Sequence, residues 1–121
     1  MLERDPESPV AGNPEGDVTV VEFFDYRCPY CRRFAERLRA MLEADPGVRF
    51  VFREWPMFGG VSVIAARAAR AADRQSQYLA MHEALMATRL LIEKAILMRA
   101  GELGLDLQRL RTDLASSEVD W

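Results

Sequence analysis

The chain has 121 residues and a formal net charge of -3. Half of the residues are apolar and 29% are charged, which is typical of one globular domain and leaves too little chain for two well-packed ones. The negative charge gives no bulk attraction to nucleic acid or to acidic membrane surfaces, so polyanion binding is a weak hypothesis. The arginines alternate with acidic residues along helical stretches, as solvated helix faces do.

The first residues of the chain contain no recognisable targeting signal. Residues 1–17 lack the apolar segment of a secretory signal, and no later stretch has the length and hydropathy of a membrane span. Three prolines and two glycines lie among the charges of these 17 residues. We therefore expect a polar lead-in with little regular structure of its own.

A strand, a helix and a second strand are predicted next. Residues 17–26, "DVTVVEFFDY", are β-branched and aromatic on both faces, which predicts a strand buried on both sides. Pro29 suits a first helical position, and apolar residues then recur at helical spacing over 29–44. A turn signal at 45–47 precedes 48–55, "VRFVFREW", whose alternation predicts a strand. This spacing is typical of a βαβ unit with parallel strands.

The second half of the chain is predicted to be helical. Ser62 is expected to cap its first helix, Gly104 to end a later one and Asp106 to cap the last. The expected helices cover residues 62–88 with a break near 74–76, then 91–104 and 107–117. We expect one domain overall, made of a lead-in (1–17), a βαβ unit (18–60) and a helical region (61–121).

The two cysteines of the chain lie at the junction of the first strand and the first helix, in the motif Cys-Pro-Tyr-Cys. The free amides at a helix start stabilise a thiolate, which favours Cys28 as a nucleophile. Cys31, one turn inside the helix, lacks such amides but lies close enough to form a small disulfide ring. The motif therefore predicts exchange through a mixed disulfide on Cys28, resolved by Cys31 or by a second thiolate. Pro29 stiffens this turn and Tyr30 sets its local packing.

Two other interpretations of the cysteines stay open. A zinc site needs about four ligands, whereas the single histidine, His82, stands alone at helical spacing and is expected to be a packed or surface residue. Two inert buried thiols would not require the strand-to-helix junction. We therefore favour a redox pair, and we expect neither a metal nor an organic cofactor.

Charged neighbours of the motif are further candidates for the site. Glu22 lies six residues before Cys28 in an apolar strand, where a carboxylate is costly without a partner or a task. A buried acid with a raised pKa can take and return the proton of Cys31. Alternatively, Glu22 faces solvent at a sheet edge or pairs with an arginine. Arginines 27, 32 and 33 would also stabilise a thiolate if they point at the sulfur.

Several segments together resemble the DsbA-like branch of the thioredoxin superfamily, over about residues 8–119. They are "GNPEGDVTVVEFFDYRCPYC", "FREWPMFG", "AARAA", "HEALM" and "ELGLDLQRL". The resemblance implies an α/β thioredoxin-like fold with an inserted helical domain, here residues 61 to about 115. It implies a thiol-disulfide oxidoreductase of the cell envelope, with Cys28 as nucleophile, Cys31 as resolving cysteine and Glu22 as buried acid.

The same resemblance implies partners and leaves alternatives. The implied partners are protein substrates that carry thiols or disulfides, together with a membrane redox partner. Donation of disulfides is the leading hypothesis. An isomerase or reductase of the same fold is the runner-up, and a non-catalytic thioredoxin-like binding module is the alternative from another class.

One departure from the family pattern concerns the end of the chain. No proline follows Pro56, so the family's cis-proline loop, closing β-hairpin and last helix have no counterpart. Two parallel strands alone would leave an unpaired edge and a poor core. We therefore expect an incomplete fold, belonging to a longer protein or completed by a domain swap or homo-oligomer.

Overall fold

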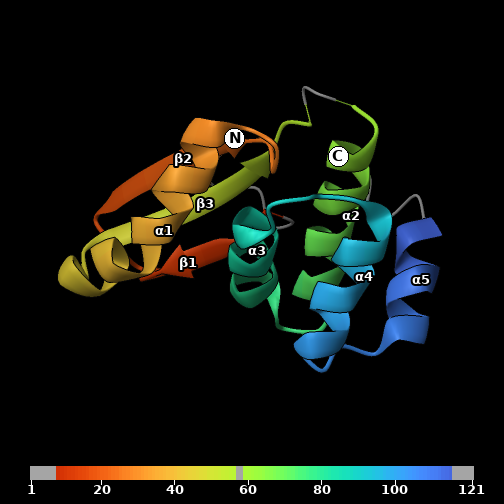
Figure 1. The fold of residues 1–121 in the computed structure, drawn as a ribbon. Helices are drawn as coiled ribbons and strands as arrows, with labels where there is room; N and C mark the ends of the chain where they lie inside the picture. Colours follow the sequence, from red (N-terminus) through yellow and green to blue (C-terminus); the bar gives the residue numbers. More distant parts are fainter. Residues whose placement is uncertain (1–7, 57–58, 116–121) are drawn as a thin grey trace.

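The computed structural model of the protein describes residues 8–56 and 59–115, and the account below concerns these residues (Figure 1). They form three strands, followed or separated by five helices. The strands are β1 (Val10–Gly12), β2 (Val18–Phe24) and β3 (Val48–Glu54), and the helices are α1 (Pro29–Ala44), α2 (Val61–Asp73), α3 (Tyr78–Ala87), α4 (Glu93–Glu102) and α5 (Leu107–Ala115).

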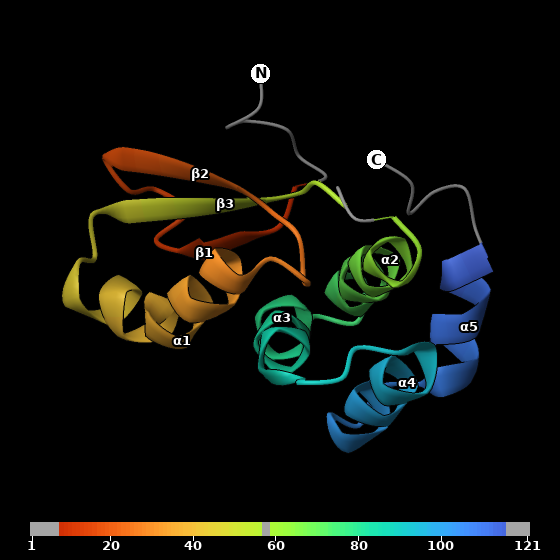
Figure 2. The same cartoon turned by 45° about the horizontal axis from the view of Figure 1, so that its top comes forward.

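The sheet has the order β1-β3-β2. β2 and β3 run parallel with Glu22 opposite Phe52, and α1 connects them, which confirms the predicted βαβ unit. α1 lies along one face of the sheet (Figure 2). On that face the ring of Phe34 stacks on Phe50 with centroids 6.0 Å apart, while Leu38 is fully buried.

The strands differ from the prediction in two ways. β1 lies inside the expected lead-in and pairs antiparallel with β3, with Val10 opposite Val51. β2 is not buried on both sides, because it lies at the edge of the sheet and pairs only with β3 among the described residues. The central strand, β3, is the deeply buried one. Apolar residues on both faces therefore predicted a strand correctly, but not its place in the sheet.

The four later helices gather beyond one end of the sheet (Figures 1 and 2). α2 packs against α3, α4 and α5, and its six buried alanines allow this close approach. The predicted break lies between α2 and α3, where Ser76 has a φ of 60°. None of the helices that the structure describes combines the length and apolar character needed to cross a membrane.

Two of the three predicted helix-end residues have the predicted role in the structure. Gly104 has a φ of 76° just after α4, where a left-handed residue ends the helix. Asp106 accepts a hydrogen bond from the backbone N–H of Arg109 at 3.1 Å, which confirms it as the cap of α5. Ser62 is not a cap, because α2 begins one residue earlier and the serine hydroxyl donates instead to Asp25 Oδ1.

Aromatic rings join the sheet to the helical region. The imidazole of His82 in α3 lies 4.8 Å from the ring centroids of both Phe24 and Phe52, on β2 and β3. Tyr26 and Tyr78 complete this cluster, with centroids 5.3 and 5.8 Å from that imidazole. Such edge-on and stacked contacts add to the hydrophobic stabilisation of the shared core.

We predict that Leu38→Ala, in the core under α1, lowers the free energy of unfolding by about 2–5 kcal/mol, because it removes buried methyl groups and leaves a cavity. Leu38 is 1% exposed. Urea unfolding measures the change, with Met41→Ala, an exposed site on the same helix, as the control. Equal losses in the two variants would contradict this packing of α1.

Candidate active site

The site begins at the turn from β2 into α1. Cys28 is the N-cap residue of α1, with Pro29 as the first helical residue, as the sequence predicts. The backbone N–H of Cys31 donates to Cys28 Sγ at 3.4 Å. The Cys28 sulfur therefore takes the place of a capping oxygen and faces the free amides of the helix start, which favour negative charge.

The two cysteines are free thiols, and both are half-buried. The pKa of Cys31 is raised to about 12, mainly by burial and also by its hydrogen bond with Cys28. A hydrogen bond from the backbone of Asp25 acts in the opposite direction and lowers this pKa. Cys31 is therefore held as a thiol, and it needs both a proton acceptor and local hydrogen bonds before it can react as a thiolate.

Glu22 adds a carboxyl group with a raised pKa to the candidate site. Burial raises its pKa from 4.5 to about 7, and its Oε1 atom has no hydrogen-bond partner among the described residues. Its charge is one of those that raise the pKa of Cys31, so the two groups influence each other. No ion pair with an arginine is seen for Glu22 within the described part of the chain, and the site holds a half-buried acid behind the cysteines.

The arginines of the motif have other partners. Arg32 donates from Nε to the carbonyl oxygen of Met86 at 2.9 Å, and from Nη2 to that of Thr88. It thus satisfies the C-terminal end of α3, where a cation is favourable. The guanidinium of Arg33 lies 5.2 Å from the ring centroid of Tyr30. The conditional expectation that Arg32 points at the sulfur is therefore wrong.

The residues just before Cys28 are anchored by buried polar contacts that the sequence analysis missed. Asp25, 2% exposed, accepts at Oδ1 from the backbone N–H of Arg27 at 2.7 Å and from the hydroxyl of Ser62 at 2.8 Å. The backbone N–H of Cys28 donates to Asp25 O at 3.0 Å. An aspartate directly after a strand is a known turn signal, and it could have indicated this anchor.

Tyr26 is a second buried anchor of this turn, and its partner is His82. The Tyr26 hydroxyl and His82 Nδ1 lie 2.9 Å apart in the core. Burial lowers the pKa of His82 to about 3, so the imidazole is neutral at physiological pH. This confirms His82 as a packed residue. Among the described residues, no group of three or more His, Cys, Asp and Glu side chains is arranged to hold a metal ion.

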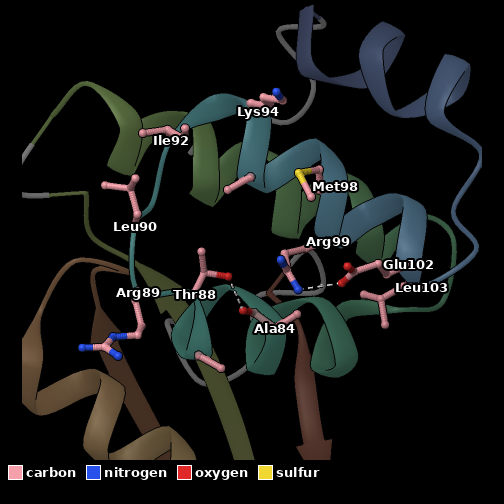
Figure 3. Close-up of a pocket in the computed structure, with 12 residues that line it drawn as sticks. Ala84, Thr88, Arg89, Leu90, Ile92, Lys94, Met98, Arg99, Glu102 and Leu103 are labelled. Atoms are coloured by element: carbon pink, nitrogen blue, oxygen red, sulfur yellow. Dashed lines mark hydrogen bonds and ion pairs between the residues drawn. The ribbon is translucent and has the colours of Figure 1, made fainter.

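A separate hollow of about 480 Å³ lies between α3 and α4 (Figure 3). Its walls include apolar side chains such as Met98 and an ion pair between Arg99 and Glu102, 2.7 Å long. Thr88, on its rim, donates its hydroxyl to Ala84 O at 2.7 Å. Neither cysteine lines this hollow, so it lies apart from the strand-to-helix turn that carries both thiols.

Comparison with known proteins agrees with this geometry. A thioredoxin family model matches residues 4–114. A thioredoxin-like oxidoreductase from Silicibacter pomeroyi superposes with a TM-score of 0.92 at 53% identity, covering 98% of this chain and 69% of that one. A periplasmic thioredoxin-like protein from Salmonella enterica serovar Typhimurium gives 0.81 at 32% identity, over 93% and 71% of the two chains.

Two further similarities are more limited. The thiol-disulfide exchange protein alpha-DsbA2 from Wolbachia pipientis shares the fold, with a TM-score of 0.87 at 23% identity over 94% of this chain and 62% of that one. The Na(+)/H(+) antiporter NhaA 3 of Salinispora tropica is 39% identical over 95% of this chain. This chain spans only 18% of the length of that curated relative.

We predict that Glu22→Gln stabilises the reduced protein at about pH 8 but has little effect at about pH 4. The pKa of Glu22 is higher in the folded protein than its ordinary value of 4.5, so the folded state binds this proton more tightly. Its contribution to stability is therefore complete below about pH 4.5 and is lost as the pH rises through about 7.

Urea unfolding at the two pH values measures this effect, with Glu36→Gln on the exposed side of α1 as the control. The same change in stability for Glu22→Gln at both pH values would contradict the raised pKa.

Proposed function

Because the chain belongs to the thioredoxin family, we propose that it is a DsbA-like thiol-disulfide oxidoreductase that exchanges disulfides with protein substrates through Cys28 and Cys31. The observation that carries the proposal is the contrast between the two sulfurs. Cys28 caps α1, whereas burial raises the pKa of Cys31. One sulfur is suited to meet the substrate, and the other is its partner in the Cys28–Cys31 disulfide.

The proposed direction is donation of a disulfide to the substrate. A substrate thiolate attacks Sγ of Cys28, the Cys28–Cys31 bond breaks, and Cys31 leaves as a thiolate. A second substrate thiolate then attacks the substrate sulfur of the mixed disulfide and expels the Cys28 thiolate. The substrate loses two thiol protons and two electrons, and the cysteine pair gains the two electrons.

Glu22 is proposed to carry the proton of Cys31. When Cys31 leaves as a thiolate, its high pKa makes it a strong proton acceptor, and Glu22, with a pKa of about 7, is protonated in a large fraction of molecules near neutral pH. The proton returns to Glu22 when the pair is reoxidised by an external partner. Pro29 and Tyr30 complete the motif, and Tyr30, 77% exposed, offers an aromatic surface beside Cys28.

We place this activity outside the cytoplasm. Disulfides form and persist in oxidising compartments such as the bacterial periplasm. The similar protein from Salmonella enterica is described as periplasmic, which supports the same location here.

A redox titration against glutathione tests the direction of exchange. A disulfide donor stabilises its reduced form, so we expect a reduction potential well above that of thioredoxin, about -270 mV. Alkylation of the free thiols at each glutathione ratio, followed by mass measurement, gives the reduced fraction. A potential at or below the thioredoxin value would exclude a disulfide donor and would favour the reductase alternative.

The isomerase alternative predicts a different preference between reduced and scrambled substrates. An isomerase must recover activity from a substrate with scrambled disulfides, whereas a donor efficiently oxidises only a reduced one. We therefore expect faster recovery from the reduced substrate, and equal rates would favour the isomerase.

A further inference from the structure

Ser62 connects the helical region to the cysteine pair through one buried hydrogen bond. It is the second residue of α2 and is 1% exposed. Its hydroxyl donates to Asp25 Oδ1 at 2.8 Å, across a sequence separation of 37 residues. A buried hydroxyl on a buried carboxylate is a strong, charge-assisted contact, so it restrains both partners.

Asp25 in turn touches both halves of the motif. Its carbonyl oxygen accepts from the backbone N–H of Cys28 at 3.0 Å, and its carboxylate also accepts from the backbone N–H of Arg27 at 2.7 Å. Its backbone hydrogen-bonds the sulfur of Cys31. The position of this one residue therefore controls the backbone hydrogen bond that favours the Cys31 thiolate.

We propose that Ser62 is a positioning residue for the resolving step, because its hydroxyl holds Asp25 where the Asp25 backbone hydrogen-bonds the Cys31 sulfur. The inference rests on the proposed exchange through Cys28 and Cys31, and it concerns the step in which the Cys31 thiolate attacks a mixed disulfide on Cys28. A thiolate accepts this hydrogen bond more strongly than a thiol does, so the bond favours the reactive form of Cys31.

The environment of Cys31 makes this bond matter. Burial, the hydrogen bond with Cys28, and the charges of Cys28 and Glu22 all disfavour the Cys31 thiolate. The Asp25 backbone is the contact that acts in the opposite direction. Loosening Asp25 should therefore decrease the thiolate fraction at a given pH.

An aromatic disulfide, dithionitrobenzoate, separates the two chemical steps in the reduced full chain. Cys28 thiolate attacks the reagent and releases one coloured thionitrobenzoate. Cys31 thiolate then attacks Cys28 Sγ of the mixed disulfide, releases a second thionitrobenzoate and forms the Cys28–Cys31 disulfide. Stopped-flow absorbance follows the two phases.

We expect Ser62→Ala to slow the second phase about threefold and to shift its pH profile to higher pH, with little change in the first phase. A tenfold lower thiolate fraction is partly offset by the greater nucleophilicity of a more basic thiolate, which gives this net factor. Ser62→Thr keeps the hydroxyl and should restore the second phase.

Ala72→Gly is the matched control, because it weakens the same helix at a buried site without touching Asp25. An unchanged second phase in Ser62→Ala, or equal slowing in Ser62→Ala and either Ala72→Gly or Ser62→Thr, would overturn the inference.

If Ser62→Ala does not fold, Asp25→Asn tests the same contact, since a neutral acceptor binds both donors more weakly and should slow the second phase. Normal resolution in Asp25→Asn would then overturn it.

The wild-type traces distinguish this inference from the proposed function. Loss of either phase in the wild-type protein would contradict thiol exchange itself. Two normal phases with no effect of Ser62 would contradict only the role of Ser62.

Discussion

The turn between β2 and α1 depends on two consecutive buried side chains that point into different parts of the helical region. Asp25 is held by Ser62 of α2, and Tyr26 by His82 of α3. These contacts determine where α1 starts and therefore where Cys28 presents its sulfur. The Asp25 carboxylate and the Tyr26 hydroxyl each have a specific buried partner, and removing that partner would leave an uncompensated group in the core.

Burial acts on both titratable groups behind Cys28. The same kind of desolvation that raises the pKa of Cys31 raises that of Glu22, which is the basis for the proton transfer proposed between them. Cys28 lies at the helix start, where free amides favour negative charge. A short motif thus combines a sulfur at the helix cap with one whose pKa is raised by burial.

The helical region contributes more than packing. His82 stays neutral among aromatic rings from β2, β3 and α3, and it fixes Tyr26 without adding charge to the site. Arg32 spans from α1 to the carbonyl groups at the end of α3. The elements that carry the cysteines and the helices beyond the sheet are therefore held together by several independent contacts near the site.

Local signals in the sequence predicted much of this architecture. Pro29 marked the start of α1, Gly104 and Asp106 marked later helix ends, and the motif itself located both sulfurs. The misses depend on contacts between distant residues. The edge position of β2 follows from its pairing with β3 alone among the described residues, and the partners of Ser62 and Arg32 lie 37 or more residues away. Propensity and spacing carry no information on such contacts.

Cys28 is the sulfur proposed to meet the substrate, and every later step of the exchange depends on it. The most direct measurement compares Cys31→Ser with Cys28→Ser after each is mixed with a disulfide-bonded protein such as insulin. Non-reducing electrophoresis and mass spectrometry detect covalent complexes. We expect Cys31→Ser to accumulate a mixed disulfide through Cys28, since no resolving thiol remains, and Cys28→Ser to accumulate none. Complexes of equal yield in both variants, or in neither, would contradict the account.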